Sequence, residues 1–423
     1  MSKSSKSPIL IIFLTVFIDL VGFGIVLPLS PLYAKSYGAS GLQIGLLMAS
    51  YSAMQFLFAP WWGRLSDRIG RRPVLLVSTA GAVVSYAIFA WGTSFAGMTA
   101  LGIIIGSRVL AGICGANITV AQAYIADITP VEQRSKRMGL IGMAFGLGFI
   151  FGPYIGSKSV QLFGPAGPGW VAASLCAANF LLALFILPES WTPSATPVAQ
   201  RARFAQWSHI LKMPTVGSLI VIFFLATFCF TCFEMTLGLV IVQNFHLIID
   251  SPEAFGVAGT LFMFCGIVGA FVQGGPIGRL VKSVGERKLI AVSLVLTGLS
   301  LAPIPFIQGS GVLSWSVLFH GGSGAWWMLL LTLAVLSIGS GLTRPPLFGL
   351  LSILTPANEQ GATIGVAQSA GSLARIVGPL FAGFFYQRHA ALPYLTCAAI
   401  ALITGLIAWQ VLVKAPTPGT AAA

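Results

Sequence analysis

Long apolar stretches, divided by short polar loops, run through almost the whole chain. Of its 423 residues, 56% are hydrophobic and only 8% are charged, whereas a soluble domain carries about 25% charged residues. A helix needs about 20 apolar residues to cross a bilayer, and twelve stretches meet that length. They lack the period-two alternation of a membrane barrel. The sequence therefore predicts an all-α integral membrane protein.

The expected transmembrane helices cover residues 9–33, 42–61, 74–95, 97–126, 137–160, 170–188, 215–246, 255–277, 288–308, 325–352, 361–387 and 391–413. If the N-terminus lies in the cytoplasm, most of the 23 basic residues fall on the cytoplasmic side, and only Lys35, Lys158 and Arg388 on the outer side. The positive-inside rule then predicts cytoplasmic N- and C-termini in a plasma (inner) membrane. This placement explains the net charge of +13 without any nucleic-acid partner.

The sequence also contains an internal repeat. GRLSDRIGRRP (63–73) aligns with GRLVKSVGERK (278–288), and ITPVEQRSKRMGLIGMAFGLGFIFGP (128–153) aligns with LTPANEQGATIGVAQSAGSLARIVGP (354–379). The second pair of segments lies farther apart than the first, and an additional outer loop at 309–324 explains the difference. We therefore expect two six-helix bundles, residues 1–188 and 214–423, related by a parallel repeat and joined by a cytoplasmic linker at 189–213.

Asp19 and Glu234 are the only acidic residues far from the ends of the apolar stretches, and they are equivalent in this repeat. An ionisable side chain inside a bilayer is costly and is by default a functional candidate. We expect both carboxyl groups to face a central cavity and to couple transport to protons. Arg108 also lies within a span, and its expected counter-ion is Asp19, since a buried arginine stays charged. The alternative is a static structural ion pair.

Other polar residues within the spans are candidates for the wall of a substrate cavity. They are Gln55, Asn117, Gln122, Arg344, Gln368 and Arg375. The uncharged members are more often interhelical hydrogen-bonding groups. Arg344 precedes Pro345 and Pro346, so the tenth span is expected to be broken there.

The loop GRLSDRIGRRPVLL resembles the signature of the major facilitator superfamily. Asp67 and Arg71 are four residues apart, within ion-pair reach on a helix, and Asp127 ends the fourth span. The resemblance implies a cytoplasmic charge cluster that locks one access state. The alternative is a basic loop that only sets topology. The candidate gate residues are Gly63, Asp67, Arg68, Gly70, Arg71, Arg72 and Asp127.

The fifth span resembles the helix signature of the drug:proton antiporter branch of that superfamily. The residues that carry the resemblance are Gly142, Gly146, Gly148, Gly152, Pro153 and Gly156. Small residues four apart let two helices approach closely. The alternative is an ordinary packing face. Ser157 stands where the signature often has a last glycine.

Over the first half, FIDLVGFGIVLPLSPLY, LSDRIGRRPVLLVSTAGAVVSYAIF and AYIADITPVEQRSKRMG resemble tetracycline efflux pumps. The resemblance implies a secondary active transporter that exports a small amphipathic or cationic compound by alternating access, with the proton as coupling ion. Ser85 replaces an aspartate typical of those pumps, and neither 255–277 nor 288–308 carries a mid-span His or Asp. The resemblance therefore concerns the scaffold rather than tetracycline itself.

Two other functions are alternatives to efflux. One is proton-linked transport of a natural metabolite such as a sugar, nucleoside or organic ion, and the other is a transporter-like membrane sensor. An enzyme is not expected, because no catalytic constellation and no phosphate-binding G-x-x-x-x-G-K-[ST] sequence occurs. Cys229 and Cys232 are interpreted as packing residues, so neither a metal nor a cofactor is expected. The expected partners are a small-molecule substrate and lipid, with the monomer as the functional unit.

Overall fold

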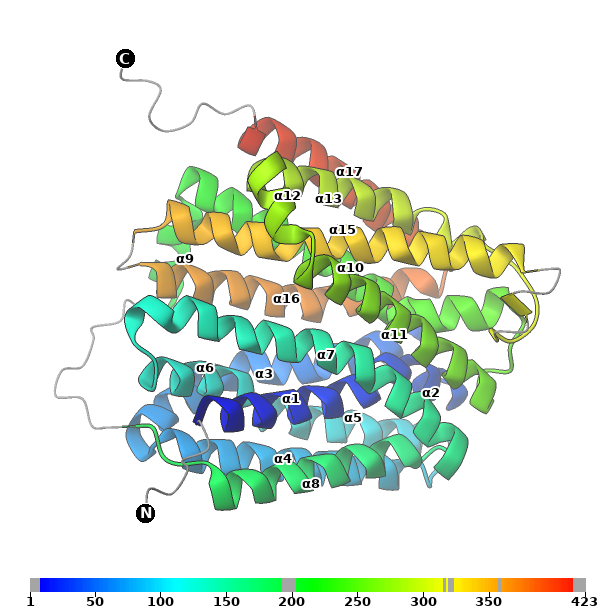
Figure 1. Ribbon diagram of the computed structural model, residues 1–423. Coiled ribbons are helices and arrows are strands. Elements are labelled where there is room, and N and C mark those ends of the chain that lie inside the picture. The colour runs from blue at the N-terminus through cyan, green and yellow to red at the C-terminus, as the bar shows by residue number, and fades with distance from the viewer. Residues whose placement is uncertain (1–7, 192–202, 315–316, 319–322, 357–358, 414–423) are drawn as a thin grey trace. The chain divides into compact units, whose positions relative to one another are not determined.

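The computed structural model describes residues 8–191, 203–314, 317–318, 323–356 and 359–413 (Figure 1). All regular structure in these ranges is helical. The helices before residue 192 are α1 (Pro8–Val26), η1 (Leu27–Leu29), α2 (Ser30–Ser36), α3 (Gly41–Ile69), α4 (Arg71–Gly92), α5 (Gly97–Ile113), α6 (Asn117–Asp127), α7 (Val131–Phe163) and α8 (Gly167–Ile186). Those after residue 202 are α9 (Arg203–Leu211), α10 (Pro214–Asn244), α11 (Pro252–Gly274), α12 (Ile277–Val284), α13 (Glu286–Leu301), η2 (Ile304–Phe306), α15 (Gly324–Leu354), α16 (Gln360–Tyr386), α17 (Leu392–Ala408) and η3 (Trp409–Val413).

Within the described residues, eleven helical segments are long and apolar enough to cross a membrane. The remaining expected span corresponds to α16, which has 27 residues but is not among the eleven. This helix carries Arg375 and Gln368 and is rich in glycine, alanine and serine. Its mean hydropathy is lower than that of its neighbours for this reason, and lower hydropathy is typical of a helix that packs against protein rather than lipid.

Two expected spans differ in continuity from the prediction. The fourth is broken at Cys114–Ala116 into α5 and α6, where the sequence analysis expected one helix. The expected break of the tenth span at Pro345 and Pro346 is wrong, because α15 continues through both prolines. Each proline removes one backbone donor, and helices in membranes tolerate this where neighbouring groups compensate.

The chain divides into two compact units. One comprises Met1–Pro197 with Leu237–Gly266, and the other comprises Val198–Thr236 with Ile267–Ala423. Small residues explain why α11 groups with the first unit. A Cβ atom at Gly259 would lie 2.5 Å from the carbonyl oxygen of Pro153, and one at Gly266 would lie 2.9 Å from Ile150. Glycine at both positions therefore lets α11 pack directly on α7.

Each unit has its own apolar core. In the first, α7 and α8 run beside α1, and α8 also runs beside α4 (Figure 1). Val16, Leu75 and Tyr124 are among the buried residues there. In the second, α13 packs between α15 and α17, and α10 and α16 contribute Phe223 and Ala367 to the core.

The backbone repeats at the aligned loops. Gly70 links α3 to α4 with φ 102° and ψ 161°, and Gly285 links α12 to α13 with φ 84° and ψ 150°. Both glycines occupy a positive-φ region that other residues rarely adopt. The charges around them are reversed, because Lys282 and Glu286 occupy the places of Asp67 and Arg71. The turn is thus repeated while its ion pair is not.

Candidate functional site

Asp19 lies on α1 in the first unit, and the side chain of Asn117, the first residue of α6, acts on its carboxyl group. The neighbouring turn of α1 is held close to α4 and α8 by Gly22. A Cβ atom there would lie 3.2 Å from the Cys176 sulfur and 3.4 Å from the Tyr86 ring. A larger residue would push the helices apart, so Gly22 sets the position of Asp19 among its neighbours.

Arg108 on α5 is only 1% exposed and does not form the expected ion pair with Asp19. Its three guanidinium nitrogens have no hydrogen-bond partner among the described residues. The group lies over two aromatic rings instead, 4.9 Å from the centre of Tyr86 and 5.5 Å from that of Phe89. Aromatic faces attract cations. The predicted ion pair between Asp19 and Arg108 is therefore wrong for this structure.

Asp19 and Arg108 nevertheless belong to one cluster. Both charges act electrostatically on the Tyr86 hydroxyl and on the Cys176 thiol. The cluster contains one cation and one potential anion without direct contact between them. A proton arriving at Asp19 would therefore change the field at Arg108 without having to break a bidentate ion pair.

The break between α5 and α6 places Asn117 at the first residue of α6. Side chains from other helices satisfy the exposed backbone. Ser78 donates to the Cys114 carbonyl and accepts from the Ala116 amide at 3.2 Å. Trp62 donates to the Ile113 carbonyl at 2.6 Å, and Gln55 donates to the Gly115 carbonyl at 3.3 Å. Gln55, expected in a substrate cavity, is thus used to hold the break.

Glu234 lies on α10 in the second unit. It is 6% exposed, and its Oε1 atom has no hydrogen-bond partner within the described residues. Arg375 of α16 acts on it electrostatically, although no basic residue lies near it in the sequence. Buried carboxylates of this kind are costly and are typical of proton-binding or ligand-binding sites.

The remaining cavity candidates separate into different environments. Arg344 and Arg375 are half-buried in the second unit, and Arg344 lies 5.5 Å from the centre of the Phe223 ring. Gln122 is half-buried on α6, whereas the Gln368 side chain is exposed on α16. Of the six candidates, Asn117 acts on Asp19 and Arg375 acts on Glu234.

The predicted gate residues form a hydrogen-bonded network at the junction of α3 and α4. Arg71 contacts Asp67 at 2.5 Å, Asp127 at 3.0 Å and the Ser66 hydroxyl at 2.7 Å. Arg71 is buried, while Asp67 is 58% exposed. A buried cation with two carboxylates and a hydroxyl is well satisfied. Arg68 is exposed outside the network, and a Cβ atom at Gly63 would have only Thr119 nearby, at 3.8 Å.

The sequence analysis missed Glu189, which follows α8. Its carboxylate accepts hydrogen bonds from the backbone amides of Arg71 at 2.9 Å and Arg72 at 3.1 Å. These amides begin α4, where an anion is favoured by unpaired donors and by the helix dipole. A Cβ atom at Gly70 would lie 2.5 Å from a Glu189 oxygen, so the loop glycine also leaves room for this carboxylate. Its sequence signal is an acid directly after a span end, Pro188–Glu189.

The glycines of the fifth span face in two directions along α7. Gly148, Gly152 and Gly156 pack on α1. A Cβ atom at Gly148 would lie 2.9 Å from the Leu20 carbonyl, and one at Gly152 would lie 2.5 Å from the Gly24 carbonyl carbon. Gly142 and Gly146 have no heavy atom within 4 Å of a Cβ position. Ser157 is buried, donates to the Tyr154 carbonyl at 2.9 Å, and faces Gly259 of α11.

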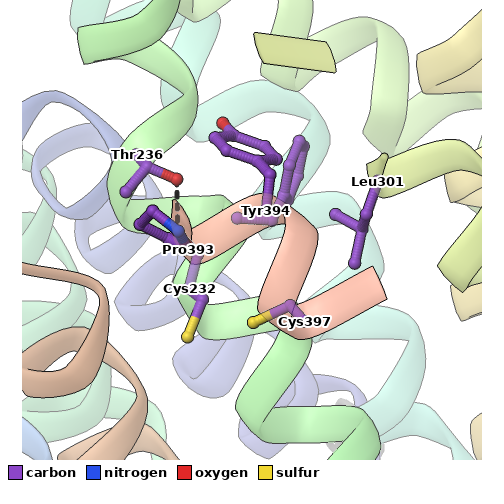
Figure 2. Close-up of a pocket in the computed structure, with 7 residues that line it drawn as sticks. Cys232, Thr236, Leu301, Pro393, Tyr394 and Cys397 are labelled. Atoms are coloured by element: carbon purple, nitrogen blue, oxygen red, sulfur yellow. Dashed lines mark hydrogen bonds between the residues drawn. The ribbon is translucent and has the colours of Figure 1, made fainter. Parts of the chain in front are cut away.

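A small pocket in the second unit is lined by Cys232, Phe233, Thr236, Leu301, Pro393, Tyr394 and Cys397 (Figure 2). Its empty volume is about 130 Å³, well below the volume of ordinary ligand sites. The Cys232 thiol donates to the Gly378 carbonyl at 3.2 Å. No metal-binding group of three His, Cys, Asp or Glu residues occurs among the described residues. This pocket is therefore a packing feature rather than a substrate site.

The helical architecture and intramembrane charges are those of a secondary transporter. The chain matches the Major Facilitator Superfamily over residues 12–325 and 275–423 and belongs to this family. Its members are transporters rather than enzymes, so this chain is a multi-pass membrane protein with a small-molecule substrate.

The chain is 34% identical over 382 residues to the class E tetracycline resistance protein of Escherichia coli, covering 88% of this chain and 86% of that protein. It is 28% identical to multidrug resistance protein 2 of Bacillus subtilis (strain 168), covering 96% and 94%. The structure of the human organic anion transporter MFSD10 (TETRAN) matches with a TM-score of 0.66 and 25% identity, covering 96% of this chain and 100% of that one. These matches confirm the resemblance found in the sequence and the predicted fold.

Proposed function

We propose that this protein is a proton-coupled exporter of a small amphipathic or cationic compound, working by alternating access. The observation that carries the proposal is Glu234, a carboxylate 6% exposed within a membrane-spanning helix and lacking a hydrogen-bond partner on Oε1 in the described residues. Such a group can take up and release a proton as its hydration changes. The names of the tetracycline and multidrug resistance relatives support export of an antibiotic-like compound.

Asp19 and Glu234 have different roles in this proposal. Asp19 belongs to the same cluster as the buried Arg108, and both charges act on Tyr86 and Cys176. Glu234 has only the more distant field of Arg375. Glu234 is therefore the proposed site of proton exchange, and Asp19 sets the electrostatic environment of Arg108 and the first-unit cluster.

The cellular setting completes the proposal. The protein acts as a monomer in a plasma (inner) membrane, with both termini in the cytoplasm as the distribution of basic residues indicates. The two halves of the chain, 1–188 and 214–423, alternate access to the substrate. Much of the linker at 189–213 lies outside the described residues.

A second substrate class is an organic anion. MFSD10 is described as an organic anion transporter, and Arg344 and Arg375 place two cations in spanning helices of the second unit. Proton-linked uptake of a natural metabolite is the alternative direction of transport. The antiporter-like glycines of α7 favour export.

Transport into inverted membrane vesicles tests the function. Vesicles that contain the protein should accumulate ethidium or tetracycline when their interior is acidified, and a protonophore should abolish the accumulation. Vesicles from cells without the protein are the control. Accumulation that is insensitive to the protonophore, or uptake of substrate in the opposite direction, would contradict proton-driven export.

The Arg71 network gives a separate prediction about the gate. Replacing Asp67 by asparagine removes one of two carboxylates from Arg71 and leaves the bond to Asp127. An exposed pair contributes about 1 kcal/mol or less, which corresponds to a shift of about fivefold between two access states. We expect transport to fall by about that factor while the amount of folded protein is unchanged.

The matched control for the gate is Arg68→Gln, which changes an exposed charge one residue away without touching the network. Transport by the control should match the parent protein when corrected for expression. Normal transport by Asp67→Asn at normal expression would show that the charge cluster only determines topology.

A further inference from the structure

The second unit contains more positive than negative charge inside its spanning helices. Arg344 lies on α15, Arg375 on α16 and Glu234 on α10. Glu234 and Arg375 interact electrostatically, as do Arg344 and Arg375. With Glu234 ionised, this cluster of three side chains still has a net charge of +1, and with Glu234 protonated the net charge is +2. No carboxylate among the described residues forms an ion pair with either arginine.

Helix packing places Arg344 and one turn of α16 beside the same aromatic ring. The Arg344 guanidinium carbon lies 5.5 Å from the centre of the Phe223 ring. Gly371 of α16 packs on the same ring, since a Cβ atom there would lie 2.8 Å from Phe223 Cε1. Arg375 follows one turn after Gly371, so it lies on the face of α16 that packs against α10.

The same face of α16 continues onto α10 beyond Arg375. Gly378 packs against Thr231, with a Cβ position 3.1 Å from the Phe228 carbonyl oxygen. Arg375 is therefore fixed between two close helix contacts, at Gly371 and at Gly378. Its backbone therefore cannot move away from α10 without breaking both contacts.

Two half-buried arginines that repel each other are unfavourable unless an anion lies near both. Guanidinium groups remain charged and present planar donors that suit carboxylate oxygens. Phe223 packs edge-to-face against Phe348, with ring centroids 5.1 Å apart, which adds an aromatic surface beside the charged groups. An aromatic or otherwise apolar compound with one anionic group matches both features.

We propose that Arg344 and Arg375 bind the anionic group of the transported compound, beside an apolar wall that includes Phe223. The site takes small amphipathic monoanions, carboxylates in particular. This inference rests on the proposed function in one respect: the bound ligand is taken to be the transported substrate. Glu234 competes with the ligand for Arg375, so its negative charge weakens anion binding.

Equilibrium binding to the full-length detergent-purified protein tests the site. The probes are naphthaleneacetate and its neutral amide, naphthaleneacetamide, measured by calorimetry at neutral pH. The parent protein should bind the acid at least about tenfold more tightly than the amide, the range of a charge-assisted hydrogen bond. Arg344→Gln and Arg375→Gln should each remove most of this preference without changing affinity for the amide. Arg375→Lys keeps the charge and should retain part of it.

Two control variants separate this site from general charge effects. Arg388→Gln removes another arginine that stacks on a phenylalanine, 4.0 Å from the Phe384 ring, but is exposed beyond the end of α16. It should bind both probes as the parent does. Glu234→Gln should bind the acid more tightly and the amide equally. Equal binding of acid and amide by the parent, or an unchanged preference in both Arg→Gln variants, would overturn the proposal.

The binding result is independent of the vesicle result. Gradient-driven ethidium transport without any preference for the acid would support the proposed export and overturn the anion site. A clear preference for the acid without gradient-driven transport would support the anion site and contradict proton-coupled export.

Discussion

Replacing Glu234 by glutamine is expected to abolish transport driven by a pH gradient without loss of ligand binding. Glutamate and glutamine have nearly the same shape, but the glutamine amide does not take up or release a proton near neutral pH. Glu234 is 6% exposed, with one oxygen unpaired among the described residues, so little packing is lost. Gradient-driven accumulation in inverted vesicles should fall to the level of vesicles without the protein, and the change in bound protons that accompanies substrate addition should disappear.

The control for this experiment is Glu253→Gln, which neutralises an exposed carboxylate in the first turn of α11. It should transport as the parent does. If Glu234→Gln still releases protons on substrate addition, the coupling site lies elsewhere, and Asp19→Asn becomes the decisive variant. Asp19 is the only other carboxylate that the sequence places deep within an apolar stretch.

Replacing Gly152 by valine is expected to prevent stable packing of α7 on α1. A Cβ atom at this position would lie 2.5 Å from the carbonyl carbon and 2.6 Å from the Cα atom of Gly24. Both atoms belong to backbone, which cannot rotate away as a side chain can. Overpacking costs about 3 kcal/mol in tightly packed cores. We expect loss of the monodisperse peak in size-exclusion chromatography and a lower unfolding temperature.

Gly146→Val is the matched control, because Gly146 belongs to the same helix and the same signature but has no heavy atom within 4 Å of its Cβ position. The change in helix propensity is equal in the two variants, so any difference between them measures packing. Equal stability of both variants would contradict the close approach of α7 to α1.

The sequence by itself determined the class of fold and the places where charge enters the membrane. Apolar stretches of spanning length can be satisfied only by helices in lipid, so the helical membrane fold could be inferred without any contact information, and the resemblance of the loop at 63–76 indicated the family. The repeated glycine turns were also readable, since Gly70 and Gly285 adopt the same positive-φ backbone at aligned positions. The gate ion pair of Asp67 with Arg71 followed from spacing along a helix, because both residues lie within one local segment.

Only the tertiary structure decided the partners of the buried charges. Arg108 lies over Tyr86 and Phe89 instead of pairing with Asp19, and side chains from α3 and α4 stabilise the break between α5 and α6. Arg375 of α16 acts electrostatically on Glu234 of α10, and Glu189 reaches the start of α4 from beyond α8. Such partners are set by which helix faces meet, and a helical sequence specifies an apolar face without specifying what packs on it.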